Sequence, residues 1–246
     1  SQIIAFPLTG FSLQWFETLL YQDTLHEALK NSLIVAISSC TLATILGTLA
    51  SRSATRYDFK GKQISLTFIL APLILPEIIV GVSLLIVLIQ LGLSLNIWSV
   101  ILGHTLLIMP FSIIIMNSAF NNLDVSLEEA SMDLGENRFG TFYRVILPLV
   151  FPGIIASLLI GFTLSLDEFI IAFFLTGTDT TLPVYIWSQF RFPKKLPTTM
   201  ALGTILIFVS LILLSISEYY RRRTYSKDFV LSTEKEPTKP IKINKD

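Results

Sequence analysis

Three acidic residues lie inside long apolar stretches of this chain, where charged side chains are rare. Glu77 follows Pro72 and Pro76 in one stretch, and Asp167 and Glu168 are neighbours in another. A charge at the centre of a membrane costs roughly 2.5–3.5 kcal/mol on insertion scales, so such residues usually face a cavity or a polar path. The interiors of these stretches contain no Lys or Arg to match the acids. This excess of acids favours a cationic substrate over ion pairs within the chain.

The three acids are therefore the predicted residues of a substrate path. The prolines before Glu77 can break a helix and free backbone carbonyls, which also attract cations. Adjacent helical residues point about 100° apart, so Asp167 and Glu168 cannot face one cavity equally. We expect Asp167 to face it, because its shorter side chain reaches the membrane interface less easily. Two alternatives stay open: pairing of the acids with a basic residue of a partner subunit, and contact of Glu168 with lipid headgroups.

A polar segment between two apolar stretches also has an informative spacing of residues. Ser126 and Glu129 have the spacing of a capping box, which predicts the start of a short helix. Gly135 can adopt the left-handed conformation that commonly ends a helix. Ala130 and Ser131 are small, so a partner can approach that face closely. A small-faced helix that carries acids suits insertion into a groove of a soluble partner; the plainer alternative is a solvated loop.

A second short helix is predicted directly after the first. Phe139, Phe142 and Ile146 recur at helical spacing, which gives one face an apolar stripe. The step Leu147-Pro148 then restricts the backbone, and we expect it to redirect the chain into the membrane. The segment 118–147 is thus predicted to be a cytoplasmic loop that contains two short amphipathic helices.

The composition indicates an integral membrane protein. Hydrophobic residues make up 52% of the 246 residues, the mean hydropathy is +0.68 and the formal net charge is zero. Charged residues make up only 15%, against about 25% in an ordinary soluble domain. These values exclude a disordered chain, a nucleic-acid-binding protein with a broad basic face, and almost any soluble enzyme.

The sequence supports no other chemistry. Gly61-Lys62 lacks the upstream glycine and the following Ser or Thr of a phosphate-binding loop. Neither His26 nor His104 has a second ligand at metal-binding spacing, and we expect His104 to hydrogen-bond a neighbouring helix. Cys40 is the only cysteine, so the chain forms no internal disulfide, and we expect it to be a packed small residue. No catalytic residue, metal site or cofactor is predicted.

Five stretches reach the roughly 20 mainly apolar residues that a transmembrane helix needs. They are Ala28–Ala50, Ile64–Leu91, Ile97–Met116, Leu147–Thr176 and Thr198–Ser217. Lys and Arg concentrate after the first, third and fifth stretches, and the positive-inside rule places those segments in the cytoplasm. Only 4 of the 18 basic residues then lie outside, namely Lys30, Arg191, Lys194 and Lys195.

This orientation divides the chain into three parts. Residues 1–27 form an outer, periplasmic segment, residues 28–218 form the membrane domain, and residues 219–246 form a polar cytoplasmic tail whose composition predicts disorder. Because the chain begins outside without an initiator Met or a signal peptide, we expect a further span upstream. Five spans of a total of six are therefore expected in this sequence.

The polar loop resembles the EAA signature of permease subunits of binding-protein-dependent ABC importers. That signature reads Glu-Ala-Ala, three residues, Gly, nine residues and Ile-x-Leu-Pro. The chain carries, at the same spacing, Glu129-Ala130-Ser131, Gly135 and Val145-Ile146-Leu147-Pro148, in which Ser131 and Val145 are conservative departures. Further stretches are similar to the second permease of spermidine/putrescine importers, namely Leu164–Glu168, Phe174–Gly177, Leu182-Pro183 and Tyr57–Lys62.

The resemblance implies a fold, a function and a set of partners. The implied fold is an all-α, polytopic transmembrane helical bundle in the bacterial inner membrane. The implied function is a polyamine permease subunit, not an enzyme, that is coupled to an ATPase through Glu129, Ala130, Ser131, Gly135, Val145, Leu147 and Pro148. The implied partners are a similar permease in a heterodimer, two ATP-binding subunits, which alone hold ATP, and a periplasmic polyamine-binding protein.

Two alternatives to polyamine import remain at this point. The first keeps the class and changes the substrate to another organic cation, iron, thiamine or sulfate, although the acids argue against anions. The second is a secondary transporter or channel, which has no need of the Glu129–Pro148 element.

Overall fold

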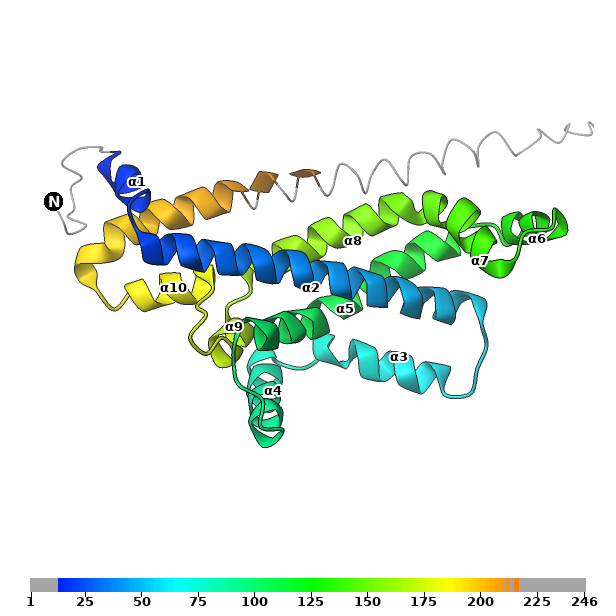
Figure 1. The fold of residues 1–246 in the computed structure, drawn as a ribbon, viewed down its shortest axis with the longest axis horizontal. Helices are drawn as coiled ribbons and strands as arrows, with labels where there is room; N and C mark the ends of the chain where they lie inside the picture. The colour runs from blue at the N-terminus through cyan, green and yellow to red at the C-terminus, as the bar shows by residue number, and fades with distance from the viewer. Residues whose placement is uncertain (1–12, 210, 213–214, 217–246) are drawn as a thin grey trace, which may run out of the picture.

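The computed structural model describes residues 13–209, 211–212 and 215–216, and these fold into helices with no strand among them (Figure 1). The elements are α1 (Gln14–Leu19), α2 (Asp23–Arg56), α3 (Lys62–Leu70), the 3₁₀ turn η1 (Ala71–Leu73), α4 (Glu77–Gln90), α5 (Ile97–Asn121), α6 (Ser126–Asp133), α7 (Arg138–Thr141), the π-helix η2 (Phe142–Ile146), α8 (Leu147–Asp167), α9 (Ile170–Leu175), α10 (Leu182–Gln189) and the 3₁₀ turn η3 (Pro193–Lys195). Residues 196–209 are also helical. The predicted disordered tail, 219–246, lies outside the described residues.

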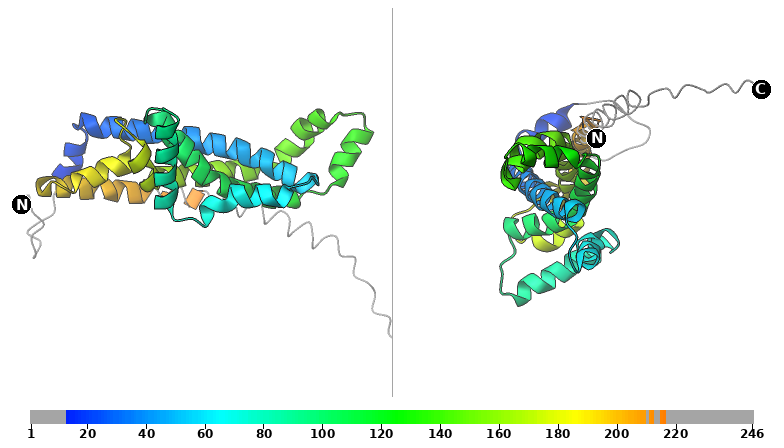
Figure 2. Two further views of the ribbon diagram at one scale, coloured as in Figure 1. Left: turned by 90° about the horizontal axis from the view of Figure 1, so that it is seen from below. Right: turned by 90° about the vertical axis from the view of Figure 1, so that its right-hand side faces the viewer.

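The centre of the molecule is a bundle of α2, α5 and α8, which lie side by side along its long axis (Figures 1 and 2). Helix α2 has 34 residues, which corresponds to about 50 Å at 1.5 Å per residue. Helices α2 and α5 run parallel. Val35 packs in one cluster with Val100, whereas Ser51, much later in α2, donates from Oγ to the carbonyl of Ile113 at 2.9 Å.

Helix α8 runs antiparallel to α2. Ser39 Oγ lies 3.1 Å from Ser165 Oγ, and Thr44 Oγ1 lies 2.9 Å from Ser157 Oγ, so the numbering rises in one helix as it falls in the other. These directions are the ones that alternate crossings of a membrane require. They also bring the end of α2 and the loop after α5 to the same end of the bundle, as the charge pattern predicts.

Small residues let the three helices approach closely, as they do in many membrane bundles. A Cβ atom added to Gly47 of α2 would lie 2.6 Å from Cβ of Ser112 on α5. A Cβ atom added to Gly161 of α8 would lie 2.8 Å from Ile108 and 3.1 Å from Cβ of Cys40. Cys40 is only 5% exposed, which confirms the prediction that it is a packed small residue.

Three helical runs in the described chain are each long and apolar enough to cross a membrane, namely Asp23–Arg56, Ile97–Asn121 and Arg138–Asp167. The predicted second span is not one straight helix, because Lys62–Leu73 and Glu77–Gln90 meet at an angle of 107°. Prolines at 72 and 76 explain this break, since proline removes a backbone donor and clashes with the preceding turn. Counted as one span, the bent pair is the fourth candidate. The predicted fifth span, 198–217, lies partly outside the described residues, so the count of five stays a prediction.

The helical run at the predicted fourth span, Leu147–Thr176, begins earlier and ends sooner than that span. The helical run begins at Arg138 and continues through Pro148, so Leu147-Pro148 does not redirect the chain. The π-helix Phe142–Ile146 ends just before Leu147-Pro148. Its wider turn allows the helix to continue although Pro148 has no backbone N–H to donate. At the other end, α8 stops at Asp167, and Glu168 has an extended backbone with φ −72° and ψ 115°.

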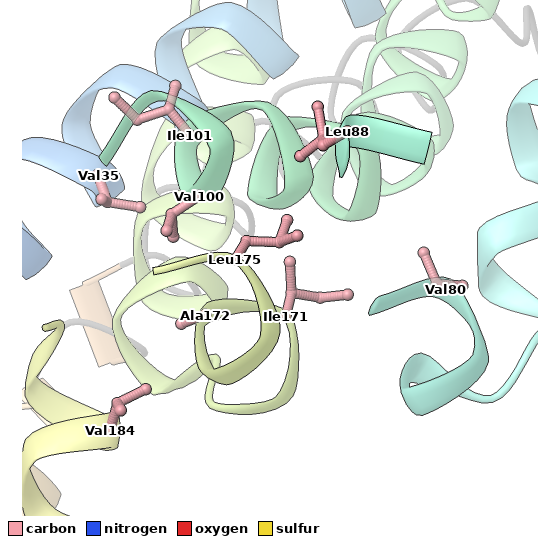
Figure 3. Close-up of a cluster of buried hydrophobic side chains, with 9 residues drawn as sticks. All are labelled: Val35, Val80, Leu88, Val100, Ile101, Ile171, Ala172, Leu175 and Val184. Atoms are coloured by element: carbon pink, nitrogen blue, oxygen red, sulfur yellow. The ribbon is translucent and has the colours of Figure 1, made fainter. Parts of the chain in front are cut away.

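Helix α4 turns away from the bundle, as Figures 1 and 2 show. Its contact with the rest of the molecule runs mainly through α9, where Ile171 and Leu175 lie in a buried cluster with Val80 and Leu88 of α4 and Val100 of α5 (Figure 3). Much of the remaining surface of α4 is apolar and exposed, including Ile78, Ile79, Ile86, Val87 and Ile89.

Candidate functional site

Two interruptions of the membrane helices meet at one cavity of about 160 Å³. Pro72 and Glu77 line it from the break between η1 and α4, and Glu168 lines it from the break between α8 and α9. His104 and Leu107 of α5 form part of another wall. Non-helical backbone at membrane depth is tolerated where it is buried in protein or lines a cavity. The coincidence of both breaks makes this cavity the candidate functional site.

The cavity lies near the middle of the bundle. Ser165, which lines it, is within 3.1 Å of Ser39 Oγ, and Ser39 stands at the midpoint of α2. At 1.5 Å per residue, this depth is roughly 25 Å from either end of α2. A ligand in the cavity would thus be far from both ends of the bundle.

The cavity brings two of the three predicted path residues together. Glu77 is the first residue of α4 and is exposed, and the N-terminus of a helix favours a negative charge. Glu168 is half-buried, and its Oε1 accepts a hydrogen bond from the backbone N–H of Ile171 at 2.9 Å. Two carboxylates from separate elements therefore border the same cavity.

Asp167, the third predicted path residue, is the last residue of α8 and is exposed. The described residues that line the cavity include its neighbour Glu168 and do not include Asp167. The lining thus favours Glu168, and our expectation that Asp167 faces the path stays a prediction.

His104 forms the hydrogen bond to a neighbouring helix that the sequence predicts. Its Nδ1 lies 2.7 Å from Ser165 Oγ of α8, and the residue is 1% exposed. Its other ring nitrogen, Nε2, has no hydrogen-bond partner among the described residues. The part of the chain that the structure describes contains no group of three or more His, Cys, Asp or Glu residues placed to hold a metal ion.

At the far end of the bundle, an ion-pair cluster attaches α6 to α2. Arg52 donates to both carboxylate oxygens of Glu128, at 2.6 and 2.5 Å, and Arg56 Nε donates to Oε1 of Glu128 at 2.8 Å. Arg56 also donates to the carbonyls of Phe120 and Leu123, at 3.3 and 3.1 Å, where α5 ends. The cluster therefore joins α2, the end of α5 and α6.

This cluster is shielded from water, since the three charged side chains are only 12–16% exposed. The guanidinium of Arg52 also lies over the rings of Phe120 and Phe142, with distances of 5.9 and 6.0 Å to the centroids. Hydrogen bonds from Arg52, and then from Arg56, lower the pKa of Glu128 below its usual value, although burial acts in the opposite direction. Glu128 is thus a carboxylate at neutral pH, held by two cations.

The predicted coupling residues lie on and after α6. Glu129 and Ala130 are exposed, whereas Ser131 is buried and its Oγ lies 3.0 Å from Thr141 Oγ1 of α7. Gly135 has φ +94° and follows the end of α6, which confirms the predicted left-handed turn. Val145, Leu147 and Pro148 do not form a boundary, because they lie within the continuous helical run that ends at Asp167.

The predicted capping box of Ser126 and Glu129 is wrong. Helix α6 begins at Ser126, preceded by Val125, and Ser126 donates its backbone N–H to Asp124 Oδ1 at 3.0 Å. Asn137 instead caps the next helix, accepting from the N–H of Gly140 at 2.8 Å. The two short helices exist as predicted, although Ser126 does not cap the first of them.

Large apolar side chains project from the surface of α6, α7 and the adjoining turns. Leu134 is 88% exposed and Phe139 is 79% exposed, and the same region exposes Val125, Met132 and Tyr143. Phe142 and Ile146, by contrast, pack inward against Met116 and Phe120. The apolar stripe that the sequence predicts is therefore divided between a buried side and an exposed side.

The sequence reasoning missed the two arginine partners of Glu128 and the place of His104 beside the acids. Arg52 and Arg56 lie four residues apart on α2, and this spacing on one helical face was the available signal. Nothing in the sequence connects His104 with Glu77 and Glu168, because the cavity depends on how three separate elements pack.

Comparison with known proteins finds a matching family. The family model described as "Binding-protein-dependent transport system inner membrane component" matches residues 43–225. The chain is 33% identical over 214 residues to the spermidine/putrescine transport system permease protein PotC of Escherichia coli (strain K12), covering 87% of this chain and 81% of PotC. It is 35% identical over 209 residues to the putrescine transport system permease protein PotI of the same strain, covering 80% and 73%.

Solved structures of ABC transporters share the fold. A chain of a bacterial ABC transporter involved in the import of the acidic polysaccharide alginate matches with a TM-score of 0.67 at 19% identity, covering 90% of this chain and 86% of that one. A chain of the MetNI methionine ABC transporter matches with a TM-score of 0.64 at 14% identity, covering 87% and 99%.

Proposed function

The chain belongs to the family of binding-protein-dependent transport system inner membrane components, and on this premise we propose that it forms the path for polyamines through an ATP-driven importer. The relatives PotC and PotI are named as permeases of spermidine/putrescine and putrescine transport systems. The observation that carries the proposal is the cavity between the two helix breaks, where Glu77 and Glu168 each place a carboxylate. Polyamines carry several ammonium groups, which such carboxylates stabilise when water is removed.

The path residues act by replacing hydration. An ammonium group that leaves water loses hydrogen bonds to solvent, and charge-assisted bonds to carboxylates are roughly twice as strong as bonds between neutral groups. The apolar wall, with Leu107, Ile108 and Phe111, suits the methylene chain between the ammonium groups. Asp167 remains the alternative member of the path, one residue before Glu168.

The loop of α6 and α7 is proposed to dock an ATP-binding subunit at the cytoplasmic face. Support comes from the exposed apolar residues Leu134 and Phe139 beside the exposed Glu129, which together make a surface of mixed character. The Arg52–Glu128–Arg56 cluster fixes this surface to α2, so a force on α6 is transmitted to a helix that spans the bundle. A secondary transporter or channel has no need of such an element.

The remaining partners are proposed from the same features. A second permease subunit is proposed to pack against the exposed apolar face of α4, which turns away from the bundle of α2, α5 and α8 (Figure 1). A periplasmic binding protein would deliver the substrate at the end of the bundle that carries α1 and α10 (Figure 1). ATP would be bound and hydrolysed by the partner subunits alone.

The test is uptake by the reconstituted complex. Proteoliposomes that contain this chain with its partner subunits, and ATP inside, should accumulate labelled putrescine or spermidine when the binding protein is supplied outside. The same vesicles without ATP are the control. Accumulation of iron, thiamine or sulfate but of neither polyamine would instead support the alternative substrates, and ATP-independent accumulation would support a secondary transporter.

A further inference from the structure

His104 lines the cavity that holds Glu77 and Glu168, and one of its hydrogen-bonding atoms is unused. The residue is 1% exposed, and Nε2 has no hydrogen-bond partner among the residues that the structure describes. Buried polar atoms without a partner are rare in native proteins, and each one needs an explanation such as a bound ligand. Both carboxylates and His104 line the same cavity, so a ligand there can supply the missing partner.

An acceptor at Nε2 of His104 requires the ring proton on Nδ1, and the hydrogen bonds around the ring are compatible with that tautomer. Ser39 donates from its hydroxyl to Ser165 Oγ at 3.1 Å, and His104 Nδ1 lies 2.7 Å from the same oxygen. A hydroxyl oxygen can accept two hydrogen bonds, so Ser165 can receive one from Ser39 and one from Nδ1–H. The neutral ring then has a bare lone pair on Nε2, which makes Nε2 an acceptor.

We infer that Nε2 of His104, together with the carboxylates of Glu77 and Glu168, forms a binding site for one primary ammonium group of the transported cation. This inference rests on the proposed function and deepens it, because it names a neutral acceptor beside the two charged ones. A primary ammonium group has three N–H donors and no acceptor. The cavity offers three acceptor groups from three elements: α4, α5 and the break between α8 and α9.

The size of the cavity agrees with a short aminoalkyl chain. A cavity of about 150 Å³ holds a benzene molecule, which has six heavy atoms. The cavity of about 160 Å³ therefore accommodates about six heavy atoms, which is the size of putrescine or of one aminoalkyl arm of a longer polyamine. Leu107, Ile108 and Phe111 line the same cavity and can contact the methylene groups of that arm.

Two substitutions of His104 separate a ligand role from a structural role. The amide of Asn reaches the position of Nδ1, so His104→Asn keeps a partner for Ser165 and removes the acceptor at Nε2. The longer Gln places its amide near Nε2, so His104→Gln keeps that acceptor and loses the bond to Ser165. A ligand role predicts that Gln preserves transport better than Asn, and a purely structural role predicts the reverse order.

The experiment measures uptake of labelled putrescine by the reconstituted complex, with one preparation of binding protein for all variants. We expect kcat/KM for uptake to fall about tenfold in His104→Asn, which corresponds to about 1.4 kcal/mol, and to fall by a smaller factor in His104→Gln. The thermal stability of the purified complex should follow the opposite order. His26→Asn is the matched control, because His26 is the other histidine and is exposed outside the cavity.

The outcomes distinguish this inference from the proposed function. Suppose that the wild-type complex imports putrescine but both His104 variants lose activity equally, or that the activity of the variants follows their thermal stability. Either result refutes the ammonium-binding site at His104, while the permease function stands. Unchanged uptake in both variants refutes it as well. If the wild-type complex imports no polyamine, the proposed function fails and the inference fails with it.

Discussion

Replacing Glu128 with Gln tests whether the ion-pair cluster holds the loop of α6 and α7 in place. The substitution keeps the size of the side chain and removes the charge that Arg52 and Arg56 contact at 2.5–2.8 Å. An exposed ion pair is worth about 0–1 kcal/mol, and breaking a fully buried pair costs about 3–5 kcal/mol. Because these side chains are 12–16% exposed, we expect the free energy that holds α6 against α2 to fall by about 2 kcal/mol.

A loss of about 2 kcal/mol corresponds to roughly a 30-fold increase in the population of the detached loop. Backbone amides of residues 126–133 should therefore exchange with deuterium roughly 30-fold faster in Glu128→Gln than in the wild-type complex. Asp133→Asn is the matched control, because Asp133 is an exposed residue of the same helix and should leave exchange unchanged. Equal exchange in wild-type protein and Glu128→Gln would refute the role of the cluster.

The same cluster has a pH dependence with a defined sign. Its two arginines lower the pKa of Glu128 in the folded state, so the stabilisation is complete above the unfolded pKa, about 4.3 for Glu. It is lost as the pH falls through the lowered folded value. The protection of the α6 amides, that is, their exchange relative to an unstructured peptide at the same pH, should therefore change little between pH 8 and about pH 5 on account of this group, and should fall only in stronger acid.

The remaining predictions concern two glycines and one acid. Gly135→Pro and Glu129→Lys should uncouple ATP hydrolysis from uptake while the complex still assembles, because Gly135 needs φ +94° and Glu129 lies on the exposed face of α6; normal ATP-driven uptake in both variants would contradict this. Gly47→Ala should lower the free energy of unfolding of the complex by about 1–3 kcal/mol, and so its melting temperature, because the added Cβ atom would lie 2.6 Å from Cβ of Ser112. Gly203→Ala, where an added Cβ has no heavy atom within 4 Å, is the control, and equal stability of both variants would show that the helices can separate without cost.

Features that depend on local pattern could be predicted from the sequence. Apolar runs of sufficient length gave the positions of α2 and α5, and the charge pattern placed Arg52 and the loop that contains Glu128 on the same side, where the structure brings them into contact. The left-handed turn at Gly135 followed from the residue type. These predictions succeed because each depends on a few neighbouring residues.

Features that depend on packing between distant elements could not be predicted. An acidic residue in an apolar run does not show that the helix stops there, so the break at Glu168 and the helical bounds around it were missed. The residue type of Pro148 predicts a change of chain direction, but the preceding π-helix allows the helix to continue. Which of Glu128 and Glu129 faces α2 depends on the exact start of α6, which the capping pattern misplaced.

The most direct test of the polyamine path is putrescine uptake by the reconstituted complex carrying Glu77→Gln, Glu168→Gln or both. Each substitution keeps the shape of the side chain and removes one charged partner of the ammonium group, which is worth about 1.5–3 kcal/mol. Uptake should therefore fall at least about tenfold in each single variant and further in the double variant, while binding to the separate binding protein stays unchanged. Asp167→Asn is compared in parallel. A larger loss of uptake in that variant than in Glu168→Gln would assign Asp167, rather than Glu168, to the substrate path. Wild-type uptake in all three single variants would contradict the account that these carboxylates carry the cation.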